Sequence, residues 1–129
     1  MAGSGGPREK RVAERIRADL SELIVRGAIR DPAVEGVIVS DVQVTNDLGV
    51  ARVFVRLLEG EPDAARQKKL LDALGRASGF LRRELAATLA VRRVPELRFA
   101  WDSGADKAAR LESIFEEIRQ DAKKTEGPR

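Results

Sequence analysis

Apolar positions near the start of the sequence repeat at helical spacing. Between residues 8 and 26, one face of the expected helix carries Val12, Ile16, Leu20, Leu23 and Ile24. Spacings of three and four residues predict an amphipathic helix. Gly27 and the Asp31-Pro32 pair that follow are typical of a helix end. The opposite face, which includes Arg11 and Arg15, is interpreted as a solvated surface.

Two segments with a period of two come next. Residues 37–45 (VIVSDVQVT) and 50–57 (VARVFVRL) are rich in β-branched residues and alternate between apolar and polar positions. This pattern predicts two β-strands. The intervening Asn46-Asp47-Leu48-Gly49 contains the residue types that tight turns favour. We therefore expect an antiparallel hairpin.

A helical pattern returns after Asp63, which is placed to cap a helix that starts at the next residue. Its apolar positions are Leu70, Leu74, Ala77, Leu81, Leu85 and Leu89. Gly75 and Gly79 interrupt the pattern, and each costs about 1 kcal/mol relative to Ala inside a helix. We therefore expect two helices that meet at a bend around Ala77-Ser78-Gly79, the second running from Gly79 to about Ala90.

The period changes back to two after Pro95. Leu97, Phe99 and Trp101 alternate with Arg98 and Ala100, so a strand is expected over residues 94–101. A last amphipathic helix is expected over residues 108–118. The order α-β-β-α-α-β-α predicts an α+β domain in which helices cover a three-stranded sheet. The domain is expected to span residues 8–120, between disordered tails at 1–7 and 121–129.

Charge is distributed unevenly along the 129 residues. The net charge of the whole chain is only +3. Residues 64–94 contain eight Lys and Arg against two Asp and Glu, a net charge of +6. Residues 34–63 have a net charge of −4, from two basic and six acidic residues. A basic block next to an acidic one points to a polyanionic partner.

The residue types present exclude several kinds of chemistry. There is no Cys and no His, which excludes disulfides, thiolate and imidazole catalysis, and zinc sites built from those residues. The carboxylate pairs Asp102 with Asp106 and Glu116 with Glu117 are interpreted as capping or solvated groups. Residues 75–79 lack the GK[ST] ending of a phosphate-binding loop. We expect no enzyme, cofactor or metal.

No stretch of the sequence is apolar enough for a signal peptide or a membrane-spanning helix. A cytoplasmic monomer with no membrane partner is therefore expected. The few aromatic residues, four Phe and one Trp, fall on predicted core positions. Recognition of a nucleic acid would then depend on backbone shape and charge, with a strong salt dependence.

The segment Ala77-Ser78-Gly79 has two interpretations. In the first, its small residues let two helices cross closely or let one helix kink. In the second, backbone N–H groups at a glycine-bearing junction contact a phosphate. The neighbouring Arg76, Arg82 and Arg83 favour the second. The residues alone leave both open, because basic clusters are also typical of solvated faces.

Four groups of residues match one known family in order. They are 11–16 (RVAERI), 42–48 (VQVTNDL) with 51–53 (ARV), 79–86 (GFLRRELA), and 92–99 (RRVPELRF) with 102–103 (DS). Each is weak alone, but all four in this order and in a chain of this length are specific. The sequence resembles the bacterial ribosome-binding factor A family over about residues 8–118.

The resemblance implies a KH-like domain of type II topology, α-β-β-α-α-β, in agreement with the order expected above. In that family an Ala-X-Gly bend replaces the usual GXXG loop, and Ala77-Ser78-Gly79 matches it. The resemblance also implies a non-enzymatic factor that binds the small ribosomal subunit late in its maturation. Such a factor assists processing of the subunit's ribosomal RNA and is important for adaptation to cold.

On this basis, basic residues would contact phosphates and the bend would orient the helices that present them. The residues expected to bind RNA are Lys68, Lys69, Arg76, Ala77, Ser78, Gly79, Arg82, Arg83, Arg92 and Arg93. Replacing Arg82 and Arg83 with Glu is expected to abolish subunit binding without unfolding the domain. Whether Arg52, Arg56 and Arg98 face RNA is left open.

The alternative function is a protein–protein adaptor. In that hypothesis the acidic loop at residues 59–63, or the last helix, docks a ribosomal protein. The basic block would then be incidental. Salt separates the two hypotheses, because phosphate binding weakens steeply with salt whereas an apolar helix interface does not.

Overall fold

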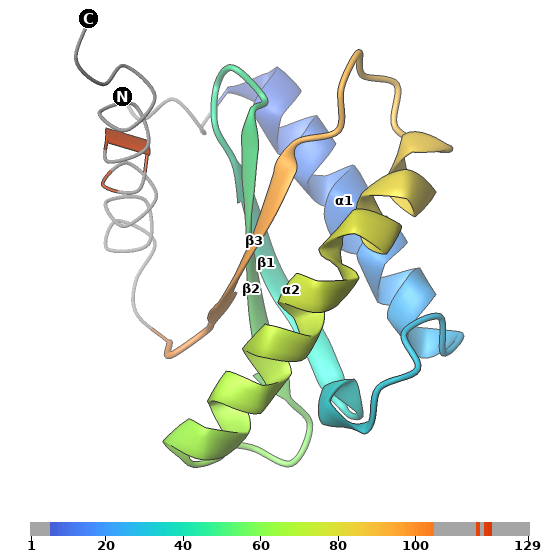
Figure 1. Ribbon diagram of the computed structural model, residues 1–129. Helices are drawn as coiled ribbons and strands as arrows, with labels where there is room; N and C mark the ends of the chain where they lie inside the picture. The colour runs from blue at the N-terminus through green and yellow to red at the C-terminus, as the bar shows by residue number, and fades with distance from the viewer. Residues whose placement is uncertain (1–5, 105–115, 117, 120–129) are drawn as a thin grey trace, which may run out of the picture.

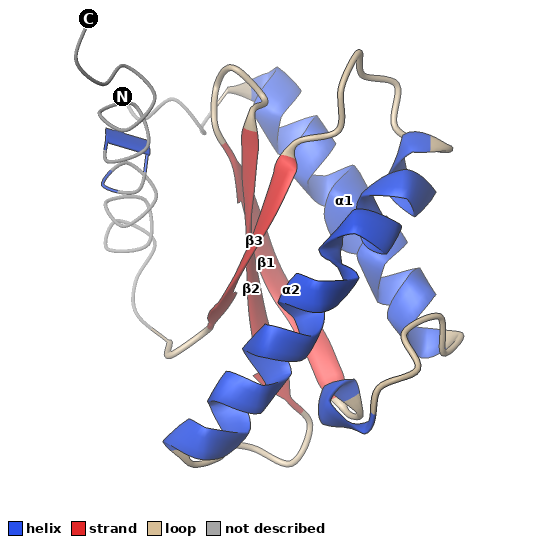
Figure 2. Cartoon of the chain, in the orientation of Figure 1, coloured by secondary structure: helices blue, strands red, loops and turns tan. Residues whose placement is uncertain are grey.

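The structure is a computed structural model that describes residues 6–104, 116, 118 and 119. Its elements in chain order are α1 (Pro7–Val25), the 3-10 helix η2 (Pro32–Val34), β1 (Val37–Val44), β2 (Val50–Leu57), α2 (Ala64–Ala86) and β3 (Glu96–Trp101). Figure 2 shows these helices and strands along the chain. The predicted last helix and the two predicted tails lie almost wholly outside the described residues.

The three strands form one sheet in the order β1-β2-β3, with β2 in the centre. β1 pairs with β2 antiparallel, which confirms the predicted hairpin, and β3 pairs with β2 parallel. A parallel pair needs a crossover connection, which α2 provides. Both helices lie on the same side of the sheet, α1 against β1 and α2 against β3 (Figure 1). The predicted α+β arrangement of helices on a three-stranded sheet is confirmed for the described residues.

The core lies between the sheet and the two helices. Alternate residues of β2 face the helices, and Ala51, Val53, Val55 and Leu57 are all buried. The helices contribute side chains that are at most 1% exposed: Ile16, Leu20, Leu70, Leu74, Leu81 and Leu85. The opposite face of the sheet carries Arg52 and Arg98, which are register partners in β2 and β3. The same face also carries Phe54, which is 4% exposed, and Gln43, which is 8% exposed. One face of the sheet therefore holds the core, and the other combines arginines with a buried aromatic side chain and a buried amide.

The turn between β1 and β2 is built on Asp47. The Thr45 hydroxyl donates a hydrogen bond to Asp47 Oδ1 at 2.7 Å, and the Gly49 amide donates to the same oxygen at 2.9 Å. These two bonds, the hydroxyl's first, lower the pKa of the Asp47 carboxyl. The left-handed residue of the turn is Leu48, with φ of 59°, rather than Gly49. Side-chain hydrogen bonds therefore hold a turn in which a leucine takes a conformation that usually favours glycine.

The expectation of two helices between β2 and β3 is wrong, because α2 is one continuous helix through Gly75 and Gly79. Each glycine costs about 1 kcal/mol relative to Ala. Burying a leucine stabilises by about 1.5–3 kcal/mol, and buried leucines flank the glycines on both sides: Leu70, Leu74, Leu81 and Leu85. Burial therefore outweighs the glycines, and the apolar stripe keeps the helix intact.

α2 ends at Ala86, four residues before the expected end at Ala90. The Thr88 hydroxyl donates to Asp19 of α1, and Leu89 turns into the core, where it is 8% exposed. These contacts draw the chain away from the helix axis and toward α1. Val94 and Pro95 are buried, and β3 begins at Glu96, two residues later than expected.

Candidate nucleic-acid interface

Four cations lie on the exposed side of α2, and we call them the basic stripe: Lys68, Lys69, Arg76 and Arg83. The last three are seven residues apart, a spacing that returns to nearly the same angle around a helix. At a rise of 1.5 Å per residue, the stripe is about 21 Å long from Lys69 to Arg83. It faces away from the sheet, because the buried leucines of α2 occupy the other side.

Two cations of the basic stripe are paired within the chain. Lys68 Nζ lies 2.8 Å from a carboxylate oxygen of Asp72, and Arg76 Nη2 lies 3.2 Å from Asp31. The amide of Ala33, and after it the Arg76 guanidinium, lower the pKa of Asp31. These pairs are exposed, and exposed ion pairs contribute little stability. A phosphate can therefore compete for both cations at small cost.

Gly75 and Gly79 lie on the same exposed side of α2. A Cβ atom at Gly75 would meet nothing within 4 Å, and at Gly79 the nearest atom would be Arg83 Nη1 at 3.7 Å. Neither glycine is required by packing within the described structure. The interpretation that they let two helices cross closely therefore loses its basis. What remains is a helix backbone left accessible between Arg76 and Arg83.

The other two residues of the predicted bend are half-buried. Ala77 packs against the hydrophobic core, and Ser78 is also partly covered. Of the segment Ala77-Ser78-Gly79, only Gly79 is exposed alongside the basic stripe.

Arg82 differs from its neighbour Arg83. Its guanidinium donates a hydrogen bond to the Val94 carbonyl oxygen at 2.8 Å, and the side chain is partly buried. Arg83 is exposed, and the structure gives it no ion pair with a described residue. Arg82 ties the segment before β3 to α2, whereas Arg83 faces solvent. Replacing both with Glu would also remove this hydrogen bond, so Arg83 alone is the position that tests binding.

Arg92 and Arg93 lie on the segment between α2 and β3, and both are exposed. The hydrogen bond from Arg82 to Val94 holds this segment beside the second half of α2. Buried Val94 and Pro95 anchor it from the other end. The structure thus brings Arg92 and Arg93 to the C-terminal half of α2, the half that carries Arg83.

The arginines whose direction was left open lie elsewhere. Arg52, Arg56 and Arg98 are on the sheet face opposite to α2, since their strand neighbours Val53 and Val55 face the core. Arg98 Nε also lies 2.9 Å from Glu96. None of the three joins the basic stripe.

Sequence reasoning missed one feature of α1. Arg11 and Arg15, which were assigned to a solvated face, line a groove with Arg8 and with residues 88–91. Their spacing of three and four residues shows that they share a helix face. The other wall of the groove comes from residues more than seventy positions later, so spacing alone could not reveal it.

No cluster of three or more acidic side chains in the described part of the chain is arranged to hold a metal ion. None of the described helices is long and apolar enough to cross a membrane.

A family model described as "Ribosome-binding factor A" matches residues 8–115. The chain belongs to the ribosome-binding factor A family. A ribosome-binding factor A from Sorangium cellulosum (strain So ce56) is 48% identical over 112 residues, covering 87% of this chain and 89% of that protein. The match extends over nearly all of both sequences, so the family assignment applies to the described fold as a whole.

Solved structures of the family share the fold. The crystal structure of ribosome-binding factor A from Thermus thermophilus aligns with a TM-score of 0.63 at 27% identity, covering 75% of this chain and 98% of that one. A Thermus thermophilus ribosome binding factor A homology model, fitted into a cryo-electron-microscopy map of a 30S–RbfA complex, aligns with a TM-score of 0.55 at 30% identity. It covers 72% of this chain and 94% of that one.

Proposed function

We propose that this chain binds the small ribosomal subunit through its ribosomal RNA, and that the basic stripe of α2 with Arg92 and Arg93 is the contact surface. It would act by binding rather than catalysis, in the cytoplasm, during late maturation of the subunit and processing of its RNA, including in the cold. Family membership supports this proposal, as does the Thermus thermophilus relative fitted into a 30S complex.

One observation carries the choice of surface. Gly79 lies on the exposed side of α2 among the cations of the basic stripe, where nothing in the described structure requires a glycine. A glycine inside a helix costs stability and leaves the backbone accessible, as suits close approach by a ligand. A phosphate beside Gly79 would be within reach of flexible side chains from Arg76 and Arg83. Recognition there would depend on charge and shape rather than on base stacking.

We further propose that the fold is KH-like, as the family resemblance implies. The described part supports this with an antiparallel hairpin, a helical crossover and a parallel third strand. In this proposal Ala77-Ser78-Gly79 takes the place of the usual loop between two helices, but inside one continuous helix. Ala77 would hold the helix to the core while Gly79 faces the ligand.

The adaptor hypothesis loses part of its support, because the acidic loop is used within the fold. The Asp63 carboxylate caps α2 by accepting a hydrogen bond from the Arg66 amide at 2.8 Å. Glu61 accepts a hydrogen bond from the Trp101 indole at 3.1 Å. The last helix, the other adaptor surface considered, lies almost wholly outside the described residues.

The test is co-sedimentation of the protein with isolated small ribosomal subunits at low and raised salt. Wild-type protein is expected to bind at low salt and to dissociate as salt rises, because phosphate contacts release counterions. Arg83→Glu is expected to weaken binding strongly. Arg56→Glu is the matched control, an exposed charge reversal on the opposite side of the sheet.

Two results would contradict the proposal. Binding that is insensitive to salt would favour an apolar protein interface. Equal loss in the two charge-reversal variants would show that net charge, rather than the basic stripe, controls association. If mature subunits bind no protein at either salt, the assay is repeated with immature particles, and failure there also rejects the proposed function.

A further inference from the structure

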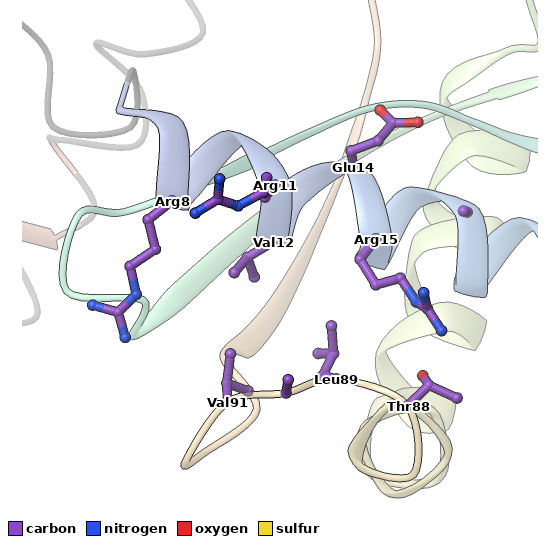
Figure 3. Close-up of a pocket in the computed structure, with 10 residues that line it drawn as sticks. Arg8, Arg11, Val12, Glu14, Arg15, Thr88, Leu89 and Val91 are labelled. Carbon is purple, nitrogen blue, oxygen red and sulfur yellow. The ribbon is translucent and has the colours of Figure 1, made fainter.

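A groove separates the first half of α1 from the segment that follows α2 (Figure 3). It has a volume of about 690 Å³, within the range of small-ligand sites. Val12 on α1 and Leu89 on the later segment point toward one another across it (Figure 3). Val91 adds a further aliphatic side chain. The floor is therefore apolar.

Arginines line the α1 side of this groove. Arg8, Arg11 and Arg15 belong to its lining, and they extend over about 10 Å of helix at 1.5 Å per residue. No ion pair or hydrogen bond joins the side chains of Arg8 or Arg11 to the described part of the chain. The one carboxylate in the lining, Glu14, points away from the groove and is hydrogen-bonded to Arg17 (Figure 3). At Arg8 and Arg11 the groove therefore presents positive charge that no described residue neutralises.

The two walls are fixed to each other at one end. Arg15 Nε lies 3.2 Å from Asp19, and the Thr88 hydroxyl donates to the same carboxylate oxygen. This contact joins α1 to the segment after α2. The groove is therefore fixed by contacts within the fold. The segment after α2 continues directly into exposed Arg92 and Arg93.

We propose that this groove binds an unpaired stretch of RNA, with phosphates at Arg8 and Arg11 and one base against the partly exposed side chains of Val12 and Val91. The inference rests on the proposed function, because it extends the surface of Arg92 and Arg93 by one further site. An apolar floor accepts the face of a base, and guanidinium planes stack on bases where aromatic residues are absent. Base faces are available in single strands, whereas duplexes keep theirs stacked inside. The site would therefore select unpaired RNA.

The experiment measures fluorescence anisotropy with two labelled RNAs, a ten-nucleotide strand without self-complementarity and a hairpin duplex of similar length. Ala90→Trp fills the groove from an exposed position without changing charge, and Arg11→Glu reverses a rim charge. The controls are Val25→Trp, at an 86% exposed position on the far end of α1, and Lys10→Glu, on α1 outside the groove. Thermal unfolding verifies that each variant is folded.

Ala90→Trp and Arg11→Glu are expected to weaken single-strand binding about tenfold or more, the scale of losing one base contact. Both controls should remain close to wild type, and duplex binding should change less in Ala90→Trp. Unchanged single-strand binding in both groove variants would overturn the inference. So would an Ala90→Trp protein that loses the subunit but keeps the RNA, since the groove would then receive a protein.

The two proposals fail separately. Groove-dependent binding of the single strand in a protein that does not associate with small subunits would reject the proposed function and leave this inference standing. Loss of subunit binding in Arg83→Glu, with no effect of the groove variants on either RNA, would support the proposed function and reject the groove as an RNA site.

Discussion

The Arg82 guanidinium donates its hydrogen bond to the Val94 carbonyl oxygen, 2.8 Å away and twelve residues later in the chain. Adjacent Arg83 faces solvent on the basic stripe. Consecutive residues of a helix are about 100° apart, so two neighbouring arginines can have separate roles. Arg82 joins α2 to the segment just before β3, and Arg83 is available to a partner.

This difference gives a first prediction. Arg82→Ala should lower the free energy of unfolding by about 1.5–3 kcal/mol, since it removes a charged donor from a partly buried carbonyl. Arg83→Ala should change stability by less than about 0.5 kcal/mol, as is usual for an exposed residue. Urea denaturation of the two variants and wild type measures both values. Equal stability of the two variants would refute the assigned role of Arg82.

The glycines of α2 give a second prediction. Gly75→Ala and Gly79→Ala should each stabilise the protein by about 0.5–1 kcal/mol, because neither new Cβ meets a close neighbour. Only Gly79→Ala should weaken subunit binding, since its methyl group would stand between the backbone and a phosphate. Thermal unfolding and co-sedimentation, done in parallel, measure the two effects. If Gly79→Ala binds as well as Gly75→Ala, phosphate does not approach the helix there.

A third prediction concerns acid. The Thr45 hydroxyl and the Gly49 amide lower the pKa of Asp47 in the folded protein. Its contribution to stability is therefore complete above the ordinary aspartate value of about 3.9 and is lost as pH falls through the lower folded value. Asp47→Asn should be less stable than wild type at pH 7 by up to about 1 kcal/mol.

The stability difference between wild type and Asp47→Asn should shrink as pH decreases from 5 to about 2. Urea titrations across this range measure it. A difference that stays constant with pH would show that the carboxylate charge does not stabilise the turn.

The fourth prediction tests the packing that keeps α2 continuous. Leu81 is fully buried one turn after Ala77, at 0% exposure. Leu81→Ala should cost about 2–5 kcal/mol, the range for truncating a buried leucine. Val25→Ala, at an exposed position, should cost less than about 0.5 kcal/mol. Circular dichroism during urea unfolding measures both costs. A lower urea midpoint for loss of the helical signal in Leu81→Ala, but not in Val25→Ala, would support the role of the buried leucines.

The sequence predicted the sheet well because strand signals are local. Alternation and β-branched residues located β2 at its observed ends, and the turn residues between 45 and 50 identified the hairpin. The continuity of α2 was missed because the cost of Gly75 and Gly79 is local, whereas the compensating burial of Leu74 and Leu81 depends on packing against the rest of the fold.

The site was predictable only in part, for a similar reason. A basic block in the sequence marks the right region, but it does not separate Arg82 from Arg83, since that depends on where the Val94 carbonyl lies. The groove between Arg11 and Leu89 is still harder to predict, because its walls meet only after the chain has folded. Local patterns reveal elements, and contacts between distant residues decide which side chains remain available.

The position of β3 in the sheet has a kinetic consequence. The hairpin closes over residues 45–49, whereas the ladder between β2 and β3 closes over residues 58–95 and therefore loses more chain entropy. Among the described strands, β3 is also an edge strand, bonded to β2 alone. It should dock late in folding and open most readily afterwards, with faster amide exchange than β2. Each opening would release Arg92 and Arg93 together with Val94, while the basic stripe on α2 keeps its shape. The basic stripe would then be a permanent part of the proposed surface, and Arg92 with Arg93 an intermittent part.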